Sequence, residues 1–529
     1  MTLLNLRVRT ANTQPLIGAG LLLFALIAGW QIAGFIVADD MRRLFFIAIA
    51  VAGCAAAVAI LNNWRKGFYI FFAWMMLEDL VRKYTGNNLF LFFGKDILLA
   101  LIYFSFFIAF RKKRERVFRP PFILFLSLFF WLGVLQIFNQ NSPSILYGLL
   151  GIKMYFYYVP LMFIGYSLIR NDEDIRRFLV LNAILAILVS CIGITQSVVG
   201  NSFLNPATLA PDLQELGNLQ KVTASGQAFN LPDSVFVSSG RYAAYLSIAF
   251  SVTMGGAGFL LLYKKNNRKL IFIALGLIGV AALMSGSRGT FVTILMTAGL
   301  LSIGFIWGAP WRSRRANHVI KAIRRSVLAV AAAVVLMILV FPQQAGTRLE
   351  FYTDTLLPNS SDYQLGLRSW DYPLQNLLKA LDDPNWLWGN GIGTTALGIQ
   401  YVQKIVGRSV LPPSVEEGFG TMIVEMGIIA PFLWILWSAS LLYFAWKIAR
   451  GLRQTRFFPI AFSIAWYCFV LLFLWTWGGL DAYENYTCNI FLWLLIGVLF
   501  ALPDIARKSD LAIEVNDTTR HDHLVYQQG

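Results

Sequence analysis

The sequence has few charged residues, few cysteines and few histidines, and these shortages limit the classes of protein to which the chain can belong. Charged side chains make up 14% of the 529 residues and hydrophobic ones 57%, whereas about 25% of residues are charged in a soluble domain. The four cysteines stand singly in or beside apolar runs, and no CxxC pair occurs. This pattern indicates neither a disulfide framework nor a zinc site of the CxxC type. The cysteines are Cys54, Cys191, Cys468 and Cys488, and the histidines are His318, His521 and His523.

Apolar runs close to the ~20 residues needed to cross a bilayer recur along the whole chain. They predict an all-α polytopic membrane protein with about 14 transmembrane helices. The first run has no AxA-like cleavage site after it, so we expect a retained span and not a signal peptide. The short third run could instead be re-entrant. The predicted spans are 16–37, 44–61, 67–81, 95–110, 121–139, 145–169, 178–199, 241–262, 270–285, 289–307, 326–341, 419–446, 457–477 and 488–503.

Basic residues gather in alternate connections between these spans, such as "RKKRERVFR" at 111–119 and "WRSRRANHVIKAIRR" at 311–325. Loops of this kind lie on the cytoplasmic side of a membrane. The net charge of +16 therefore reflects topology and a lipid-bilayer environment, and no nucleic-acid partner is expected. With an even number of spans, both termini are predicted to be cytoplasmic.

The predicted organisation has four parts: N-terminal transmembrane helices (1–341), a large extracytoplasmic loop (342–418), C-terminal transmembrane helices (419–503) and a cytoplasmic tail (504–529). Within the loop, "SWDYPLQNLLKAL" places apolar residues at helical spacing, which predicts an amphipathic helix on the membrane surface or over a cavity. The run "GNGIGTTALG" (389–398) follows, and its glycines predict tight turns. The apolar positions are Trp370, Leu374, Leu377, Leu378 and Leu381.

Two arginines begin spans on the side opposite the basic loops. Arg288 lies in "MSGSRGTF" beside Ser287, and Arg241 lies in "SSGRYAAYLS". A lone boundary arginine is explained simply by its side chain reaching toward lipid headgroups. However, a helix start with free amides, small residues and an arginine is also a good anion site. Together, the two helix starts predict a site for a diphosphate.

In its second half, about 240–450, the chain resembles the O-antigen polymerase and ligase family of bacterial inner-membrane proteins. The resemblance rests on "SGSRGTF", "GRYAAYLSIAF", "LRSWDYPLQNLLKALDDPNWLWGNGIGTT" and "EEGFGTMIVEMGIIAPFLW", which occur in the family's order. It implies a C-type glycosyltransferase (GT-C) architecture, a periplasmic active site, and a polyprenyl-diphosphate-linked oligosaccharide as donor, with no metal and no cofactor. It also implies that Arg288 and Arg241 bind the donor diphosphate, with Arg368 in "GLRSW" as a third candidate.

One departure from the family separates two functions. Ligases of this family carry a histidine just before the twelfth span, whereas this chain has Glu416 followed by Glu417. A carboxylate there resembles the polymerase branch, so we expect a polymerase that makes O-antigen or exopolysaccharide, with a possible chain-length regulator protein as partner. An O-antigen ligase that transfers glycan to lipid A core is the alternative. A lipid-linked oligosaccharide flippase is an alternative of another class.

The polymerase hypothesis gives the candidate residues roles in a single displacement. An acceptor hydroxyl attacks the anomeric carbon, Arg288 and Arg241 stabilise the departing diphosphate, and Glu416 or Glu417 serves as base. The two glutamates could instead form a solvated acidic face at a helix start.

Several further residues are weaker candidates. Lys153 lies inside the sixth span, where a charge in hydrocarbon indicates a specific role: it could pair with an acidic residue, contact the diphosphate or stabilise packing. Arg348 and Arg368 could bind substrate or be ordinary loop cations. The remaining acidic candidates for a base are Glu78, Asp79 and Asp96.

Overall fold

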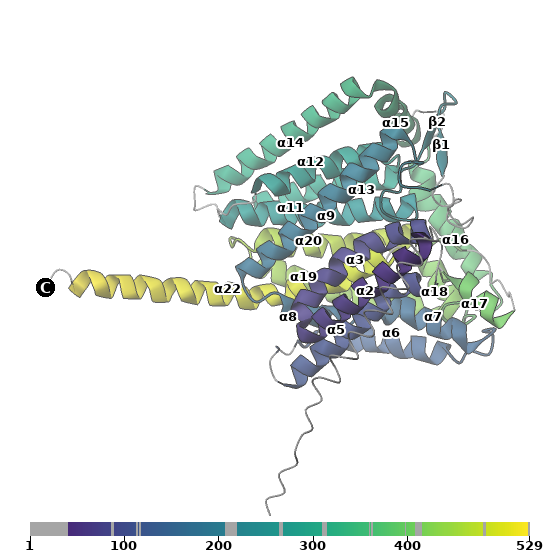
Figure 1. Cartoon of the computed structure of the whole chain (residues 1–529), viewed down its shortest axis with the longest axis horizontal. Helices are drawn as coiled ribbons and strands as arrows, with labels where there is room; N and C mark the ends of the chain where they lie inside the picture. Colours follow the sequence, from purple (N-terminus) through teal and green to yellow (C-terminus); the bar gives the residue numbers. More distant parts are fainter. Residues whose placement is uncertain are drawn as a thin grey trace, which may run out of the picture. The chain divides into compact units, whose positions relative to one another are not determined.

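The described residues of the computed structural model are almost all helical (Figure 1). Two short strands, β1 (Gln220–Val222) and β2 (Ala228–Asn230), pair antiparallel with Lys221 opposite Phe229. The predicted first span, 16–37, and the side chains of all three histidines lie outside the described residues. The structure describes residues 41–85, 89–112, 115, 118–206, 219–263, 268–308, 315–358, 360, 363–396, 398–407, 415–479 and 483–526.

Seven helices in the described part of the chain are long and apolar enough to cross a membrane. The protein is therefore an all-α, multi-pass membrane protein. The span that begins at Ser239 is the most deeply buried of the seven. The seven are Ile145–Leu168, Asp172–Val199, Ser239–Leu262, Arg288–Gly308, Ile429–Gly451, Phe458–Gly478 and Tyr486–Lys508.

The chain divides into two compact units, and the division passes through α3 (Trp64–Thr85) and α5 (Gly94–Arg111). The first unit contains residues 1–71 and 96–105, of which α2 (Met41–Asn62) is the main described element. Within it, α3 packs closely on the end of α2, since a side chain at Gly67 would come within 2.8 Å of the Ile60 Cα. The Ser105 hydroxyl donates to the Ile60 carbonyl (3.1 Å).

The second unit, residues 72–95 and 106–529, contains a group of neighbouring helices around α11 (Figure 1). α11 (Ser239–Tyr263) contacts α9 (Asp172–Val199), α12 (Arg268–Met284), α13 (Arg288–Gly308) and α14 (Arg315–Val340). Small residues allow this packing: a side chain at Gly193 in α9 would collide with the ring of Tyr242. Because α12 runs back alongside α11, the helices α11 and α13 begin at the same end of the group.

A second group consists of α6 (Ile123–Gln136), α7 (Ile145–Phe156), α18 (Gly418–Met426) and α19 (Ile429–Gly451). α20 (Phe458–Phe469) joins the groups by packing on both α11 and α19. The predicted span 419–446 is broken into α18 and α19 at Gly427. Its φ of +80° favours glycine, and a side chain there would collide with the Leu387 carbonyl oxygen.

The predicted span 145–169 is confirmed as the candidate span Ile145–Leu168, but a turn divides it into α7 and α8 (Leu161–Leu168), with Pro160 at the start of the second. Proline favours the first turn of a helix and disrupts an interior one. α8 packs on the long C-terminal helix α22 (Tyr486–Tyr526). The contact is close because Gly497 approaches the Met162 carbonyl, with no room for a side chain.

The segment between α14 and α18 contains α15 (Pro342–Leu356), a π-helical turn η1 (Leu367–Asp371), α16 (Tyr372–Leu381) and α17 (Ile399–Val406). The predicted amphipathic helix is confirmed as α16. It packs on α18, with Leu377 and Leu381 against a buried cluster that includes Val424. In contrast, Trp370 is 63% exposed. The hydrophobic spacing therefore identified this helix correctly within the long loop.

Candidate functional site

A cavity of about 290 Å³ lies at the start of α11. α3, α5, α7, α11 and α17 contribute to its wall, as do α4 (Leu89–Phe92) and the residues around the start of α22. Its volume is near the lower end for small-molecule sites. Four lining side chains are cations, Arg82, Lys95, Lys153 and Arg241; five are aromatic, Phe92, Tyr158, Tyr401, Tyr483 and Tyr486. Among the described lining residues, Glu484 is the single carboxylate.

Arg241 is held at the cavity by an ion pair with a buried carboxylate of α3. The Arg241 Nη1 lies 2.9 Å from the Asp79 Oδ2, and Asp79 itself is fully buried. One turn along α3, the Arg82 Nη1 donates to the other carboxylate oxygen (2.8 Å). The Arg241 guanidinium also lies 5.1 Å from the centre of the Tyr486 ring. Asp79 therefore fixes two of the cavity's cations.

Lys95 is fixed by the residue next to Asp79. Its Nζ lies 2.8 Å from the Glu78 Oε1, and its backbone N–H donates to the Glu78 Oε2 (3.0 Å). Lys95 Nζ also lies 4.6 Å from the centre of the Tyr486 ring. Glu78 and Asp79 therefore act as buried counter-ions, and not as accessible bases. Asp96, the third weaker candidate, belongs to the first compact unit.

Lys153, predicted to have a purpose within its span, projects into the same cavity as Arg241. Its Nζ lies 4.5 Å from the centre of the Phe93 ring and 5.0 Å from that of Phe92. The described lining itself contains four cations and one carboxylate, Glu484, while the buried Glu425 behind the wall accepts from the hydroxyl of the lining residue Thr395. The balance favours an anionic ligand.

Arg288 belongs to a different cluster. It begins α13, and the Ser287 hydroxyl caps this start by accepting from the Thr290 backbone N–H (3.4 Å). The Lys221 Nζ donates to the nearby Gly286 carbonyl (3.3 Å). Burial, followed by the charges of Arg288 and Arg368, lowers the pKa of Lys221 from its ordinary value to about 8. We call Lys221, Arg288 and Arg368 the second basic group; the cavity lining described above does not include it.

The second basic group predicts an unusual lysine titration. Lys221 is expected to lose its proton near pH 8, because burial and two neighbouring cations disfavour its charged form. ¹³C NMR of the reductively methylated protein would measure the midpoint, and Lys221→Arg would identify the resonance. Arg288→Ala should raise the midpoint by removing one repelling charge. A wild-type midpoint near that of the exposed lysines would contradict the clustering.

The Arg348 side chain is bound by backbone carbonyl groups of several neighbouring segments. Its guanidinium donates to the carbonyl oxygens of Met284 (2.7 Å), Gln344 (2.8 Å), Asn230 (3.3 Å) and Ser197 (3.4 Å). The side chain therefore ties α15 to the ends of α9 and α12 and to β2. Desolvation by burial lowers its pKa to about 10. These contacts support the simpler of the two roles that the sequence left open.

The two glutamates predicted as bases have other partners. Glu416 is exposed and accepts from the Tyr372 hydroxyl (2.6 Å), while the Arg368 guanidinium lies 4.8 Å from the centre of the same ring. Glu417 is fully buried and caps α18 by accepting from the backbone N–H groups of Phe419 and Gly420. Burial raises the pKa of Glu417 to about 7. Neither residue is in the described cavity lining.

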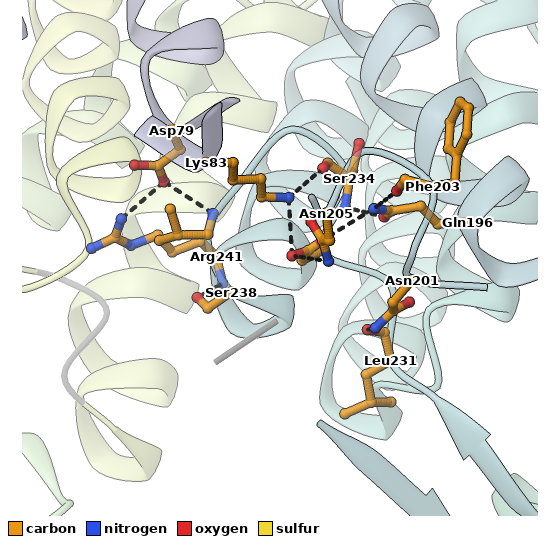
Figure 2. Close-up of polar contacts among 12 residues, drawn as sticks. Asp79, Lys83, Gln196, Asn201, Phe203, Asn205, Leu231, Ser234, Ser238 and Arg241 are labelled. Atoms are coloured by element: carbon orange, nitrogen blue, oxygen red, sulfur yellow. Dashed lines mark hydrogen bonds and ion pairs between the residues drawn. The ribbon is translucent and has the colours of Figure 1, made fainter. Parts of the chain in front are cut away.

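A buried polar network beside the cavity holds the segment that leads into α11 (Figure 2). The Lys83 Nζ lies 2.9 Å from the Asp233 Oδ2 and donates to the Ser234 carbonyl (2.9 Å). Asp233 also accepts from the side-chain amides of Gln196 (2.9 Å) and Asn205 (3.2 Å). We call this set the Lys83–Asp233 clamp. It fixes the approach to Arg241 because residue 233 lies only eight positions before it (241 − 233 = 8).

Sequence reasoning did not select Arg82, Lys95 or Glu484 for this site. Arg82 and Lys95 stand at the ends of predicted spans, where basic residues are ordinary. Glu484 stands in "YENY" between two tyrosines that also line the cavity. A carboxylate between aromatic residues just before a span is the signal that could have identified it.

The described residues contain no cluster of three or more His, Cys, Asp or Glu side chains suited to a metal ion. Comparisons with protein-family models, with curated proteins and with solved structures find no match to this chain. The geometry of the cavity and of the second basic group is therefore the basis for a functional proposal.

Proposed function

We propose that this protein is a polysaccharide polymerase that joins polyprenyl-diphosphate-linked oligosaccharide repeat units at the periplasmic face of a bacterial inner membrane. In this proposal it is a metal-independent glycosyltransferase of the GT-C type, with about 14 spans and both termini in the cytoplasm. The observation that carries the proposal is the cavity at the start of α11. Its excess of cations suits a diphosphate, and its aromatic side chains suit sugar rings.

The cavity supports a reaction in which a diphosphate leaves. When the bond between the anomeric carbon and the diphosphate oxygen breaks, negative charge builds up on the leaving group. Arg241 and Lys95 are already held in place by buried carboxylates. Cations fixed before the reaction stabilise the developing charge without having to reorganise.

The second basic group favours a polymerase over a ligase. A polymerase handles two lipid diphosphates, one on the donor and one on the acceptor. We assign the donor diphosphate to the cavity and the acceptor diphosphate to Lys221, Arg288 and Arg368. Arg241 stands in the first turn of α11 and Arg288 is the first residue of α13, which supports this assignment. This assignment separates Arg241 from Arg288, which the sequence alone suggested would grip a single diphosphate.

The identity of the product tests the proposal. The purified protein would be reconstituted in liposomes with lipid-linked repeat units extracted from cells that lack it. We expect a ladder of multi-repeat glycans still attached to polyprenyl diphosphate, with one polyprenyl diphosphate released per bond formed. Electrophoresis and mass spectrometry would measure both products. Transfer only to added lipid A core would indicate a ligase, and translocation without bond formation would indicate a flippase; either result would contradict the proposal.

A further inference from the structure

The carboxylates that the sequence singled out as bases are engaged away from the cavity space. Glu417 caps α18 from a fully buried position, and Glu416 accepts from Tyr372. Glu78 and Asp79 are fully buried counter-ions of Lys95 and Arg241. A displacement by a sugar hydroxyl needs a proton acceptor within hydrogen-bond reach of that hydroxyl. None of these four side chains is in the described cavity lining.

Glu484 is placed differently, because it is part of the cavity wall itself. It is the single carboxylate in the described lining, and it is 5% exposed. Asp481, its nearest acidic neighbour in sequence, lies outside the described residues. After burial, the charges of Glu484 and of the buried Glu425, which accepts from the Thr395 hydroxyl, raise the pKa of the neighbouring Tyr483 well above its ordinary value. The carboxylate therefore lies where a ligand in the cavity would meet it.

The surroundings of Glu484 connect it to the cations of the same cavity. Two residues later, the Tyr486 ring lies 4.6 Å from the Lys95 Nζ and 5.1 Å from the Arg241 guanidinium carbon. One residue earlier, the Tyr483 ring stacks on Tyr155 of α7 with centroids 4.1 Å apart. Aromatic contacts on both sides hold this stretch in position. The cavity therefore presents a carboxylate and several cations to one ligand.

We propose that Glu484 is the base of the polymerisation reaction, an inference that rests on the proposed function. The acceptor hydroxyl oxygen forms a bond to the anomeric carbon of the donor sugar as its proton passes to the Glu484 carboxylate. The bond between that carbon and the diphosphate oxygen breaks, and its electron pair leaves with the polyprenyl diphosphate. Glu484 then releases the proton to water. A single displacement of this kind inverts the anomeric configuration.

Glu484→Gln tests this role because it keeps the size of the side chain and removes its basicity. In the liposome assay, we expect the rate of glycan bond formation to fall about a hundredfold, within the range for general bases. Binding of farnesyl diphosphate, measured by calorimetry on the purified protein, should stay within about twofold of the wild type, because the cations remain. The rise in the wild-type pH–rate profile that reflects titration of the base should be lost in the variant.

Two further variants separate catalysis from structure. Glu484→Asp keeps a carboxylate and should recover part of the rate, whereas Glu173→Gln, a matched control on α9 outside the cavity and the second basic group, should keep the wild-type rate. Wild-type polymerisation by Glu484→Gln would overturn the inference alone. A parallel loss of farnesyl diphosphate binding and rate would also overturn it, in favour of a structural role. If the wild-type protein itself formed no ladder of multi-repeat glycans, the result would instead contradict the proposed function.

Discussion

Replacing Arg241 with alanine is expected to lower glycan polymerisation about a thousandfold, the upper end for loss of one fixed group that stabilises developing charge. The change removes one of four lining cations and leaves the buried Asp79 with Arg82 as its remaining arginine partner. The lining would then retain three cations beside Glu484. The liposome assay would measure the rate, and calorimetry would measure the expected loss of farnesyl diphosphate affinity.

The matched controls test whether position or charge matters. Arg241→Lys keeps the charge without the planar pair of donors, so we expect a partial loss of rate. Arg453 follows the C-terminal end of α19, and its guanidinium carbon lies 3.9 Å from the centre of the Trp307 ring. Because it is not part of the described cavity lining, Arg453→Ala should leave the rate unchanged. Normal ladders from Arg241→Ala in membranes with wild-type protein levels would show that the cavity does not hold the donor.

Replacing Asp233 with alanine is expected to destabilise the protein by about 3–5 kcal/mol, the cost of removing one partner of a buried ion pair. The Lys83 and Asp233 side chains are each 1% exposed, so the lysine charge would stay buried without its carboxylate. Two side-chain amides would lose an acceptor as well. Thermal and denaturant unfolding in detergent would measure the change in the free energy of unfolding.

A partly exposed ion pair provides the control for this measurement. Glu173 pairs with Arg176 one turn away in α9, where the two side chains are 35% and 25% exposed, so Glu173→Ala should cost less than about 1 kcal/mol. The double variant Lys83→Met with Asp233→Ala should recover part of the loss, because no uncompensated charge then remains buried. Equal effects of Asp233→Ala and Glu173→Ala would contradict the role of the Lys83–Asp233 clamp.

Hydropathy predicted the helical class well and helix continuity less well. The spacing of Leu377 and Leu381 was sufficient to identify α16, because burial on one side of a helix depends on local sequence. The hydropathy pattern did not predict the breaks at Gly427 and before Pro160, because hydropathy averaged over ~20 residues does not resolve a single turn. At Gly427 the break depends on the close approach of Leu387, a contact between residues far apart in the chain.

The site was predicted in part for a similar reason. Arg241 and Lys153 were selected because a charge in or beside an apolar run is conspicuous, and both line the cavity. The separation of Arg288 from the cavity lining was not predicted, because matching local motifs do not reveal which side chains share a wall. The ion pair with Asp79, which lies 162 residues away in the sequence, fixes the position of Arg241. A local sequence pattern does not predict an ion pair between residues so far apart.

The polar side chains of α3 also determine how far this helix can move along its own axis. Glu78, Asp79 and Lys83 pair with residues from three other segments, namely Lys95, Arg241 and Asp233. A slip by one turn, about 5.4 Å, would break all three pairs together. The helix is therefore pinned at one depth, and thinning or thickening of the surrounding lipid would be absorbed by other parts of the protein before the charges at the cavity shifted.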